Sequence, residues 1–303
     1  MALLVWLITG ASAGIGAALV EEIVRRGDKV IAANRQVGQM ADRASENVSL
    51  LDLDITSGPK VIASKVKEAW QIFGHIDVLV NNAGTFLFTP FEDTSDDEAE
   101  RIFQTNVFGQ LHLTRAILPF FRQRGSGTIT FTGSNQLSGN MPSTTYYNMT
   151  KWTNSSLAES LRKEVSSLGI RCVAFECGGV ATRLFEPREK DKIGKEDKSP
   201  IEAYVPGFTA ASQDLGEWGM PPGDPAKVAK TMADVVKGEG MAVGRVWSSR
   251  IALGSDSLRW WKIKRQQEDV VMDRWEDVTL STDRDDAVLS DKLDRFALIA
   301  GAE

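Results

Sequence analysis

The sequence contains only two cysteines and two histidines among its 303 residues. Cys172 and Cys177 fall in or beside one predicted strand, where a separation of five residues points the two thiols to opposite faces. The thiols are then too far apart for a disulfide, so we expect both to be reduced. Because His75 and His112 form no cluster with the cysteines, the sequence gives no support for a zinc-type metal site.

An excess of positive charge and a long apolar run are also missing. The formal net charge is −6, which argues against a nucleic-acid partner because such binding depends on clustered Lys and Arg meeting phosphates. The apolar run at residues 2–8 is too short to span a bilayer and lacks the charged start and cleavage site of a signal peptide. With 42% apolar and 25% charged residues, we expect a soluble, cytoplasmic protein of one large or two smaller domains.

Apolar runs of strand length alternate with amphipathic helical patterns along most of the chain. The expected strands are residues 3–9, 29–34, 47–54, 76–80, 127–132 and 170–176, with a seventh at 250–253. The expected helices are residues 17–26, 59–73, 95–122 and 225–237, together with one that ends near residue 168. This alternation predicts an α/β fold with a doubly wound parallel sheet that binds its ligand at the carboxyl ends of the strands.

A glycine-rich turn follows the first expected strand. Glycines let the backbone approach a pyrophosphate closely, and the free amides at the start of the next helix attract its negative charge. Because the turn lies between two expected strands, we interpret it as a dinucleotide site, the alternative being a merely structural turn. The motif is Thr9-Gly10-Ala11-Ser12-Ala13-Gly14-Ile15-Gly16.

Two other strand ends carry residues suited to the adenosine half of a dinucleotide. Asn34 and Arg35 close the second strand, where an acidic residue would repel a ribose 2′-phosphate. Arg35 can instead pair with that phosphate, which favours NADP over NAD, unless it is simply an exposed surface cation. Asp54 and Ile55 end the third strand, where Asp54 either accepts a hydrogen bond from the adenine amine or caps the next helix.

Glycines and amides also end the fourth and sixth expected strands. Such residues suit a backbone that passes closely under a cofactor, although simple turns use them too. In a parallel sheet these ends meet, so we expect Gly10, Asn82, Ser134, Tyr147 and Gly178 to converge. The two motifs are Asn81-Asn82-Ala83-Gly84 and Gly178-Gly179-Val180-Ala181-Thr182.

Tyr147 and Lys151 are four residues apart, which places them side by side on a helix. A lysine charge about 4 Å away, at an effective dielectric constant of about 20, is worth about 4 kcal/mol, or roughly three units of the tyrosine pKa. Such a pair can transfer protons, whereas a packed ring beside a solvated amine is the ordinary alternative. Tyr146 is the weaker candidate because an offset of five residues turns it about 140° away from Lys151. Asn106 interrupts the apolar face of the helix expected at 95–122, where a satisfied structural amide is the default interpretation.

In combination and in this order, these motifs resemble the short-chain dehydrogenase/reductase family, in its single-domain branch. The resemblance covers about residues 3–254 and implies a Rossmann-like sheet with a catalytic tetrad of Asn106, Ser134, Tyr147 and Lys151. It also implies that an arginine such as Arg35 selects the phosphorylated cofactor. The residues expected to contact NADP(H) are Gly10, Ser12, Gly14, Ile15, Gly16, Asn34, Arg35, Asp54, Ile55, Asn82, Ala83, Gly84, Tyr147, Lys151, Gly178, Val180 and Thr182.

In the mechanism that the resemblance implies, Tyr147 donates a proton to a carbonyl oxygen while NADPH delivers hydride to its carbon. Ser134 hydrogen-bonds and polarises that oxygen. Lys151 lowers the pKa of the tyrosine and holds the nicotinamide ribose, and Asn106 organises the water that resupplies the proton. The expected function is therefore reduction of a ketone or aldehyde, or the reverse oxidation of an alcohol. The alternatives are a non-catalytic cofactor-binding regulatory protein and a non-redox isomerase or cyclase on the same scaffold.

Two residues depart from the family pattern. Cys177 replaces the usual proline before Gly178, a change that could loosen the loop beside the nicotinamide. Thr150 stands where the family often has serine, and we expect no consequence from this change.

The chain after the sixth strand falls into two parts. Residues 183–222 are irregular and apolar, as in a lid over a medium to large apolar substrate, with ordinary packing on the core as the alternative. Residues 255–303 form a charged, tryptophan-bearing extension outside the main domain at 1–254. The extension is either a helix clamped on the body or a surface for a partner, such as another copy in a homodimer or homotetramer. The apolar residues of the lid segment are Leu184, Phe185, Tyr204, Val205, Phe208, Leu215, Trp218 and Met220.

Overall fold

The computed structural model describes residues 3–185, 201–217, 219–288 and 290–297. In this part of the chain seven strands form one sheet in the order β3-β2-β1-β4-β5-β6-β7, and every neighbouring pair is parallel. The doubly wound sheet expected from the alternating pattern is thus confirmed. The strands are β1 (Val5–Thr9), β2 (Lys29–Asn34), β3 (Val48–Asp52), β4 (Val78–Asn81), β5 (Gly127–Thr132), β6 (Ile170–Cys177) and β7 (Arg250–Leu253).

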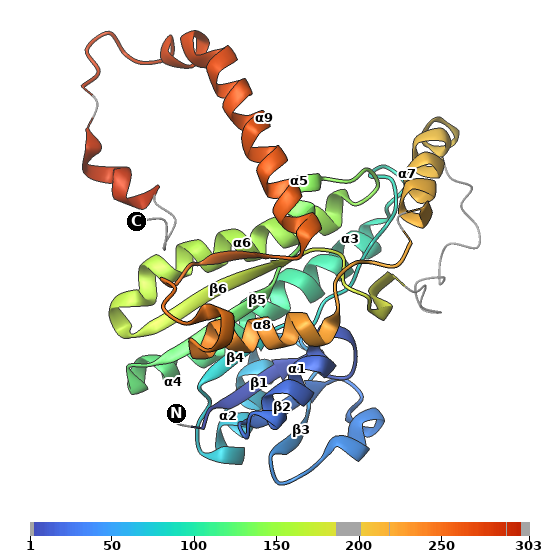
Figure 1. Cartoon of the computed structure of the whole chain (residues 1–303), viewed down its shortest axis with the longest axis vertical. Coiled ribbons are helices and arrows are strands. Elements are labelled where there is room, and N and C mark those ends of the chain that lie inside the picture. The colour runs from blue at the N-terminus through green and yellow to red at the C-terminus, as the bar shows by residue number, and fades with distance from the viewer. Residues whose placement is uncertain (1–2, 186–200, 218, 289, 298–303) are drawn as a thin grey trace.

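Helices cover both faces of the sheet (Figure 1). The α-helices are α1 (Gly14–Arg25), α2 (Pro59–Phe73), α3 (Asp96–Phe103), α4 (Gly109–Arg124), α5 (Gln136–Gly139), α6 (Thr145–Val165), α7 (Val205–Glu217), α8 (Pro225–Lys237) and α9 (Ser255–Leu280). Short 3₁₀ segments are η1 (Val37–Arg43), η3 (Ser166–Leu168), η4 (Arg183–Phe185), η6 (Glu202–Tyr204), η7 (Gly240–Ala242) and η8 (Asp291–Phe296). The helix that carries Tyr147 and Lys151 therefore ends as α6 at Val165 and continues to Leu168 only as a 3₁₀ turn.

Two apolar clusters, one on each face of the sheet, form the core. Leu7 of β1 belongs to the cluster that packs against α2, α4 and α6, whereas Trp6 and Ile8 belong to the cluster that packs against α1 and α8. This division follows from the strand geometry, in which successive side chains point to opposite faces. Cys172 and Cys177 lie in different clusters and are both free, as expected from their spacing.

The helix expected at 95–122 is not a single α-helix. Ser95 starts it with a capping box to Glu98, but a π-helical turn, η2 (Gln104–Phe108), separates α3 from α4. Such a turn carries one extra residue and is frequent at functional sites. Asn106 lies within this turn and is completely buried, so the turn positions a polar side chain inside the core.

The expected irregular lid is partly wrong. Residues 205–217 form the regular helix α7, and Phe208 on this helix contacts the ring of Phe88 at a centroid distance of 5.1 Å. A cluster of apolar residues gave no helical start signal, which is why the helix was not expected. Residues 186–200 and Trp218, which the lid prediction included, lie outside the described residues.

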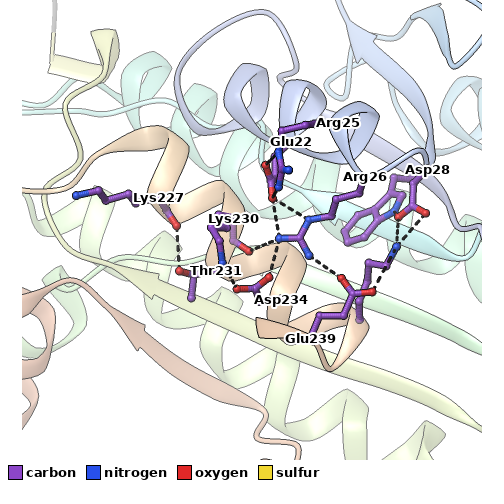
Figure 2. A network of polar contacts seen from close by, with 11 residues as sticks. Glu22, Arg25, Arg26, Asp28, Lys227, Lys230, Thr231, Asp234 and Glu239 are labelled. Carbon is purple, nitrogen blue, oxygen red and sulfur yellow. Dashed lines mark hydrogen bonds and ion pairs between the residues drawn. The ribbon is translucent and has the colours of Figure 1, made fainter. Parts of the chain in front are cut away.

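A network of charged side chains joins α1 to α8 (Figure 2). Arg26 contacts Glu22, Asp234 at 2.6 Å and Glu239 at 3.0 Å. Beside it, Asp28 is fully buried and accepts hydrogen bonds from Lys237 at 2.9 and 3.0 Å. The network holds the C-terminal end of α1 against α8 on one face of the sheet.

Helix α9 begins directly after β7 and leaves the body of the molecule. Its first turns contact α5 and β7, and the rest projects away from the sheet (Figure 1). No helix in the described residues combines the length and apolar character that a membrane span requires.

Candidate active site

A cavity of about 1470 Å³ lies at the carboxyl ends of the strands, where the sequence analysis expected a ligand. Its walls contain nearly all of the residues predicted for the site. Two of those residues are not in its lining: Gly16 lies beneath the glycine turn and Asn106 lies in the core. The predicted residues that do line it are Gly10, Ser12, Gly14, Ile15, Asn34, Arg35, Asp54, Ile55, Asn82, Ala83, Gly84, Ser134, Tyr147, Lys151, Gly178, Val180 and Thr182.

The glycine turn needs its glycines for conformation and for space. Gly10 and Gly14 have φ values of +65° and +55°, in the left-handed region. A Cβ atom on Gly10 would lie 2.9 Å from the Cα of Ala83, and one on Gly16 would collide with the carbonyl oxygen of Gly10. At the start of α1, Ala13 offers no side-chain cap, so the first backbone amides are open to an anion. These observations fit a bound pyrophosphate.

Asn82 joins the ends of three central strands. Its Nδ2 donates to the carbonyl oxygen of Thr9 at 2.9 Å, and its Oδ1 accepts from the hydroxyl of Thr132 at 3.3 Å. The hydroxyl of Thr9 in turn accepts from the backbone amides of Asn82 and Ala83, both at 3.1 Å. The amide side chain thus holds the floor of the cavity together.

The ends of β2 and β3 lie side by side at one end of the cavity. Arg35 is exposed there, and Asn34 turns its Oδ1 back to accept from the Arg35 amide at 2.9 Å. Asp54 accepts from the amide and hydroxyl of Thr56, whereas α2 begins after Gly58, which lacks a side-chain cap. The alternative that Asp54 caps the following helix is therefore wrong, and its contact with adenine stays a prediction.

Ser134, Tyr147 and Lys151 come together in the wall of the cavity. Tyr147 is hydrogen-bonded to Ser134, and its ring makes an edge contact with Phe86 at a centroid distance of 4.9 Å. The Nζ of Lys151 donates to the carbonyl oxygen of Thr132 at 2.7 Å. All three functional side chains are less than 8% exposed, so packing holds them in place.

The expectation that Lys151 lowers the pKa of Tyr147 is wrong for this geometry. Burial raises the pKa of Tyr147 to about 12, and the hydrogen bond with Ser134 offsets only part of that effect. Burial also lowers the pKa of Lys151 to about 8. The ammonium group lies 5.6 Å from the centroid of the tyrosine ring, over its face, and desolvation is the main cause of both pKa shifts.

Asn106 is linked to α6 by hydrogen bonds through Thr150. Its Oδ1 accepts from the amide of Thr85 at 2.8 Å, and its Nδ2 donates to the carbonyl oxygen of Thr85 and to the hydroxyl of Thr150 at 3.1 Å. That hydroxyl donates to the carbonyl oxygen of Tyr147 at 2.7 Å. Through this hydroxyl, which a serine would also carry, Thr150 connects Asn106 to the helix that contains Tyr147.

The loop after β6 is held by the first turn of α9. The amide of Gly179 donates to Asp256 at 2.7 Å, and the amide of Gly178 donates to the carbonyl oxygen of Leu253 at 2.7 Å. Asp256 also accepts from the side chain of Asn135, next to Ser134. With these bonds the loop is anchored although Cys177 stands where a proline is usual.

Several lining residues were not anticipated from the sequence. Phe86 and Thr105 lie within two residues of predicted site residues. Their closeness in the sequence to these residues could have identified them as part of the lining. Trp260 gave no such signal because it belongs to α9, in the extension. Its ring packs against Gly139, where any Cβ atom would collide with it. The unanticipated residues include Phe86, Arg101, Thr105, Met141 and Trp260.

Comparisons with known proteins agree with this geometry. The oxidoreductase BOA17 of Botryotinia fuckeliana is 34% identical over 184 residues, which are 59% of this chain and 66% of that protein. A short-chain dehydrogenase from Streptomyces avermitilis is 30% identical, with a TM-score of 0.80 over 93% of this chain and 100% of that chain. A 3-ketoacyl-(acyl-carrier-protein) reductase from Brucella melitensis complexed with NADH, 24% identical, covers 84% of this chain and 98% of that chain with a TM-score of 0.66 and shares the fold.

The match to the family is extensive even though the alignments with individual relatives are partial. The chain spans 66% and 57% of the length of two curated relatives that it matches. The family model described as short chain dehydrogenase matches residues 4–193, more than half of the chain. Together with the seven-stranded parallel sheet and its glycine turn, this match means that the chain belongs to the short-chain dehydrogenase family.

Proposed function

We propose that the protein is an NADP(H)-dependent oxidoreductase that reduces the carbonyl group of a ketone or aldehyde. The observation that carries this proposal is the meeting of Ser134, Tyr147 and Lys151 in the wall of a cavity that also contains the glycine turn. A reduced nicotinamide dinucleotide bound along this cavity supplies the hydride. The remaining chemistry is a proton transfer, which the side chains of the chain itself can perform.

Tyr147 is the proton donor in this proposal. With a pKa of about 12, its hydroxyl keeps its proton at neutral pH and can give it to a carbonyl oxygen that gains negative charge. Ser134, hydrogen-bonded to Tyr147, donates to the same oxygen once a substrate is bound. Lys151 keeps most of its charge at neutral pH, since its pKa is about 8, and can hold a ribose hydroxyl.

The walls near Tyr147 favour a medium to large apolar substrate. The apolar part of the lining comes from segments far apart in the sequence, including the β4–α3 connection, α7 and α9. Such walls bind apolar groups by removing them from water and leave the carbonyl group as the polar anchor. The apolar residues in question are Phe86, Met141, Leu184, Leu215 and Trp260.

The preference for NADP(H) rests on Arg35. The Brucella reductase was crystallised with NADH, so fold similarity does not select the cofactor. Replacing Arg35 with Ala should weaken NADPH binding ten- to a hundredfold, because a charge-assisted phosphate contact is worth about 1.5–3 kcal/mol. Steady-state KM values for NADPH and NADH measure this effect, with NADH as the internal control. Equal effects on both cofactors, or a wild-type preference for NADH, would contradict the assignment.

The reaction should also depend on the charge of Lys151. For reduction, kcat/KM is expected to fall about tenfold per pH unit above pH about 8, because Lys151 loses its proton there. Tyr147, with a pKa of about 12, remains protonated throughout this window. The Lys151→Arg variant should have lower activity than wild type. Its pH profile should lack the decline above pH about 8 because arginine keeps its charge. A wild-type profile that stays flat from neutral pH to pH about 10 would exclude this role of the lysine charge.

A further inference from the structure

The first turns of α9 lie beside the part of the cavity that contains Ser134. Helix α9 follows β7, which is at the edge of the sheet opposite β3. Its first turns contact α5, the short helix that comes just after Ser134 (Figure 1). The glycine turn and Arg35 follow β1 and β2, on the other side of the sheet. This helix is therefore placed to contact a substrate rather than the adenosine half of a dinucleotide.

Hydrogen bonds fix the start of α9 on the body of the molecule. The side chain of Glu176 is completely buried and accepts from the indole of Trp261 and, at 2.6 Å, from Arg250. The hydroxyl of Ser257 donates to the carbonyl oxygen of Glu176 at 2.7 Å. On the next loop, Asp256 accepts from the amide of Gly179 at 2.7 Å. Sliding or rotating the helix would break these bonds, so the directions of its first side chains are fixed.

Trp260 brings α9 into the lining of the cavity. It comes three residues after Ser257, so both side chains lie on one side of the helix. The ring of Trp260 packs against Gly139 of α5, where any Cβ atom would collide with it. At the start of α5 the amide of Gln136 donates to the hydroxyl of Ser134 at 3.2 Å. The indole thus forms a wall on the Ser134 side of the cavity.

We propose that Trp260 is a specificity-determining residue, whose ring limits the size of the apolar substituent that a substrate places beside Ser134. The inference rests on the proposed carbonyl chemistry at this site. The cavity of about 1470 Å³ exceeds the roughly 300–1,000 Å³ of an ordinary small-molecule site, so it has room for a cofactor and a substrate together. The substrates selected in this way are apolar ketones with one substituent compact enough to fit against the indole.

Two ketones that share a phenyl group test the proposal. The second substituent is a methyl group in acetophenone and another phenyl group in benzophenone. In Trp260→Ala the ratio of kcat/KM for benzophenone to that for acetophenone should rise at least about tenfold over wild type, because the misfit of one methylene in an apolar pocket is already worth roughly ten- to 200-fold. Trp275→Ala, which removes an exposed tryptophan farther along α9, should leave the ratio unchanged. An unchanged ratio in Trp260→Ala, or an equal rise in both variants, would overturn the proposal.

Gly139→Ala tests the same contact without removing a side chain of α9. The added methyl group collides with the indole and displaces it. The ratio should therefore change in the wild-type background and stay constant in the Trp260→Ala background, where no ring is present. Equal changes in both backgrounds would mean that the effect does not pass through Trp260. If Trp260→Ala does not fold, Gly139→Ala decides alone, and an unchanged ratio would then contradict the proposal.

Binding measurements separate this inference from the proposed reaction. In the presence of NADP⁺, which carries no hydride to transfer, the two ketones can bind but cannot be reduced. Isothermal titration calorimetry then gives their dissociation constants for wild type and Trp260→Ala without turnover. If wild type reduces neither ketone, the proposed function fails, yet the ratio of these constants should still shift toward benzophenone in the variant. If both ketones are reduced and neither ratio shifts, only the role of Trp260 is wrong.

Discussion

Tyr147→Phe is expected to lower turnover at least a hundredfold while leaving the dissociation constant for NADPH nearly unchanged. The substitution removes only the hydroxyl group that donates the proton, and positioned proton donors contribute about 10²- to 10⁴-fold to rate. The ring keeps its buried position and its edge contact with Phe86. Single-turnover rates of NADPH oxidation and a fluorescence titration of NADPH measure the two quantities separately.

The neighbouring tyrosine provides the matched control. Tyr146 is stacked on Phe91 at a centroid distance of 5.0 Å and is absent from the lining of the cavity. Tyr146→Phe should therefore turn over at close to the wild-type rate. Near-normal turnover of Tyr147→Phe, or equal losses in the two variants, would remove Tyr147 from the reaction.

Lys237→Met is expected to lower the free energy of unfolding by about 3 to 4 kcal/mol. The substitution keeps most of the aliphatic side chain but removes the ammonium group that contacts both carboxylate oxygens of Asp28. Asp28 is fully buried and, among the described residues, would retain hydrogen bonds only from the indole of Trp6 and the amide of Leu4. An unpaired buried carboxylate is far more costly than a lost surface pair. Chemical denaturation followed by circular dichroism measures the change.

Two further variants separate this mechanism from a general effect on α8. Lys230→Met removes an ammonium group that is half exposed, and its partner Asp234 keeps the contact with Arg26, so the loss should stay below about 1 kcal/mol. Combining Asp28→Asn with Lys237→Met removes both charges and should recover part of the loss. If Lys230→Met and Lys237→Met cost the same, burial of Asp28 is not the cause.

The parts of the fold that could be predicted are those that depend on the pattern of neighbouring residues in the sequence. Continuous apolar runs such as residues 3–9 identified buried parallel strands, and the glycine turn between two such runs identified the nucleotide end of the cavity. Gly10 and Gly14 have the left-handed backbone that only glycine adopts readily. The positions of these glycines in the sequence therefore indicated the conformation of the turn.

The parts that could not be predicted depend on contacts between distant segments. The link from Asn106 through Thr150 to Tyr147 exists only because a π-helical turn packs against α6. The raised pKa of Tyr147 follows from its burial, which helical spacing does not reveal. Likewise, Trp260 reaches the cavity from a helix that was expected to lie outside the main domain.

Reduction of carbonyl groups with NADPH is the reaction proposed for this chain. Its most direct test is the rate of NADPH and NADH oxidation by the wild-type protein against ketones and aldehydes of graded size. Carbonyl-dependent oxidation is expected to be faster with NADPH than with NADH, and faster with larger apolar carbonyls than with small ones. Binding of NADPH without oxidation by any member of the panel would contradict it and would favour a regulatory role. Product formation without net NADPH consumption would instead indicate an isomerase or a cyclase.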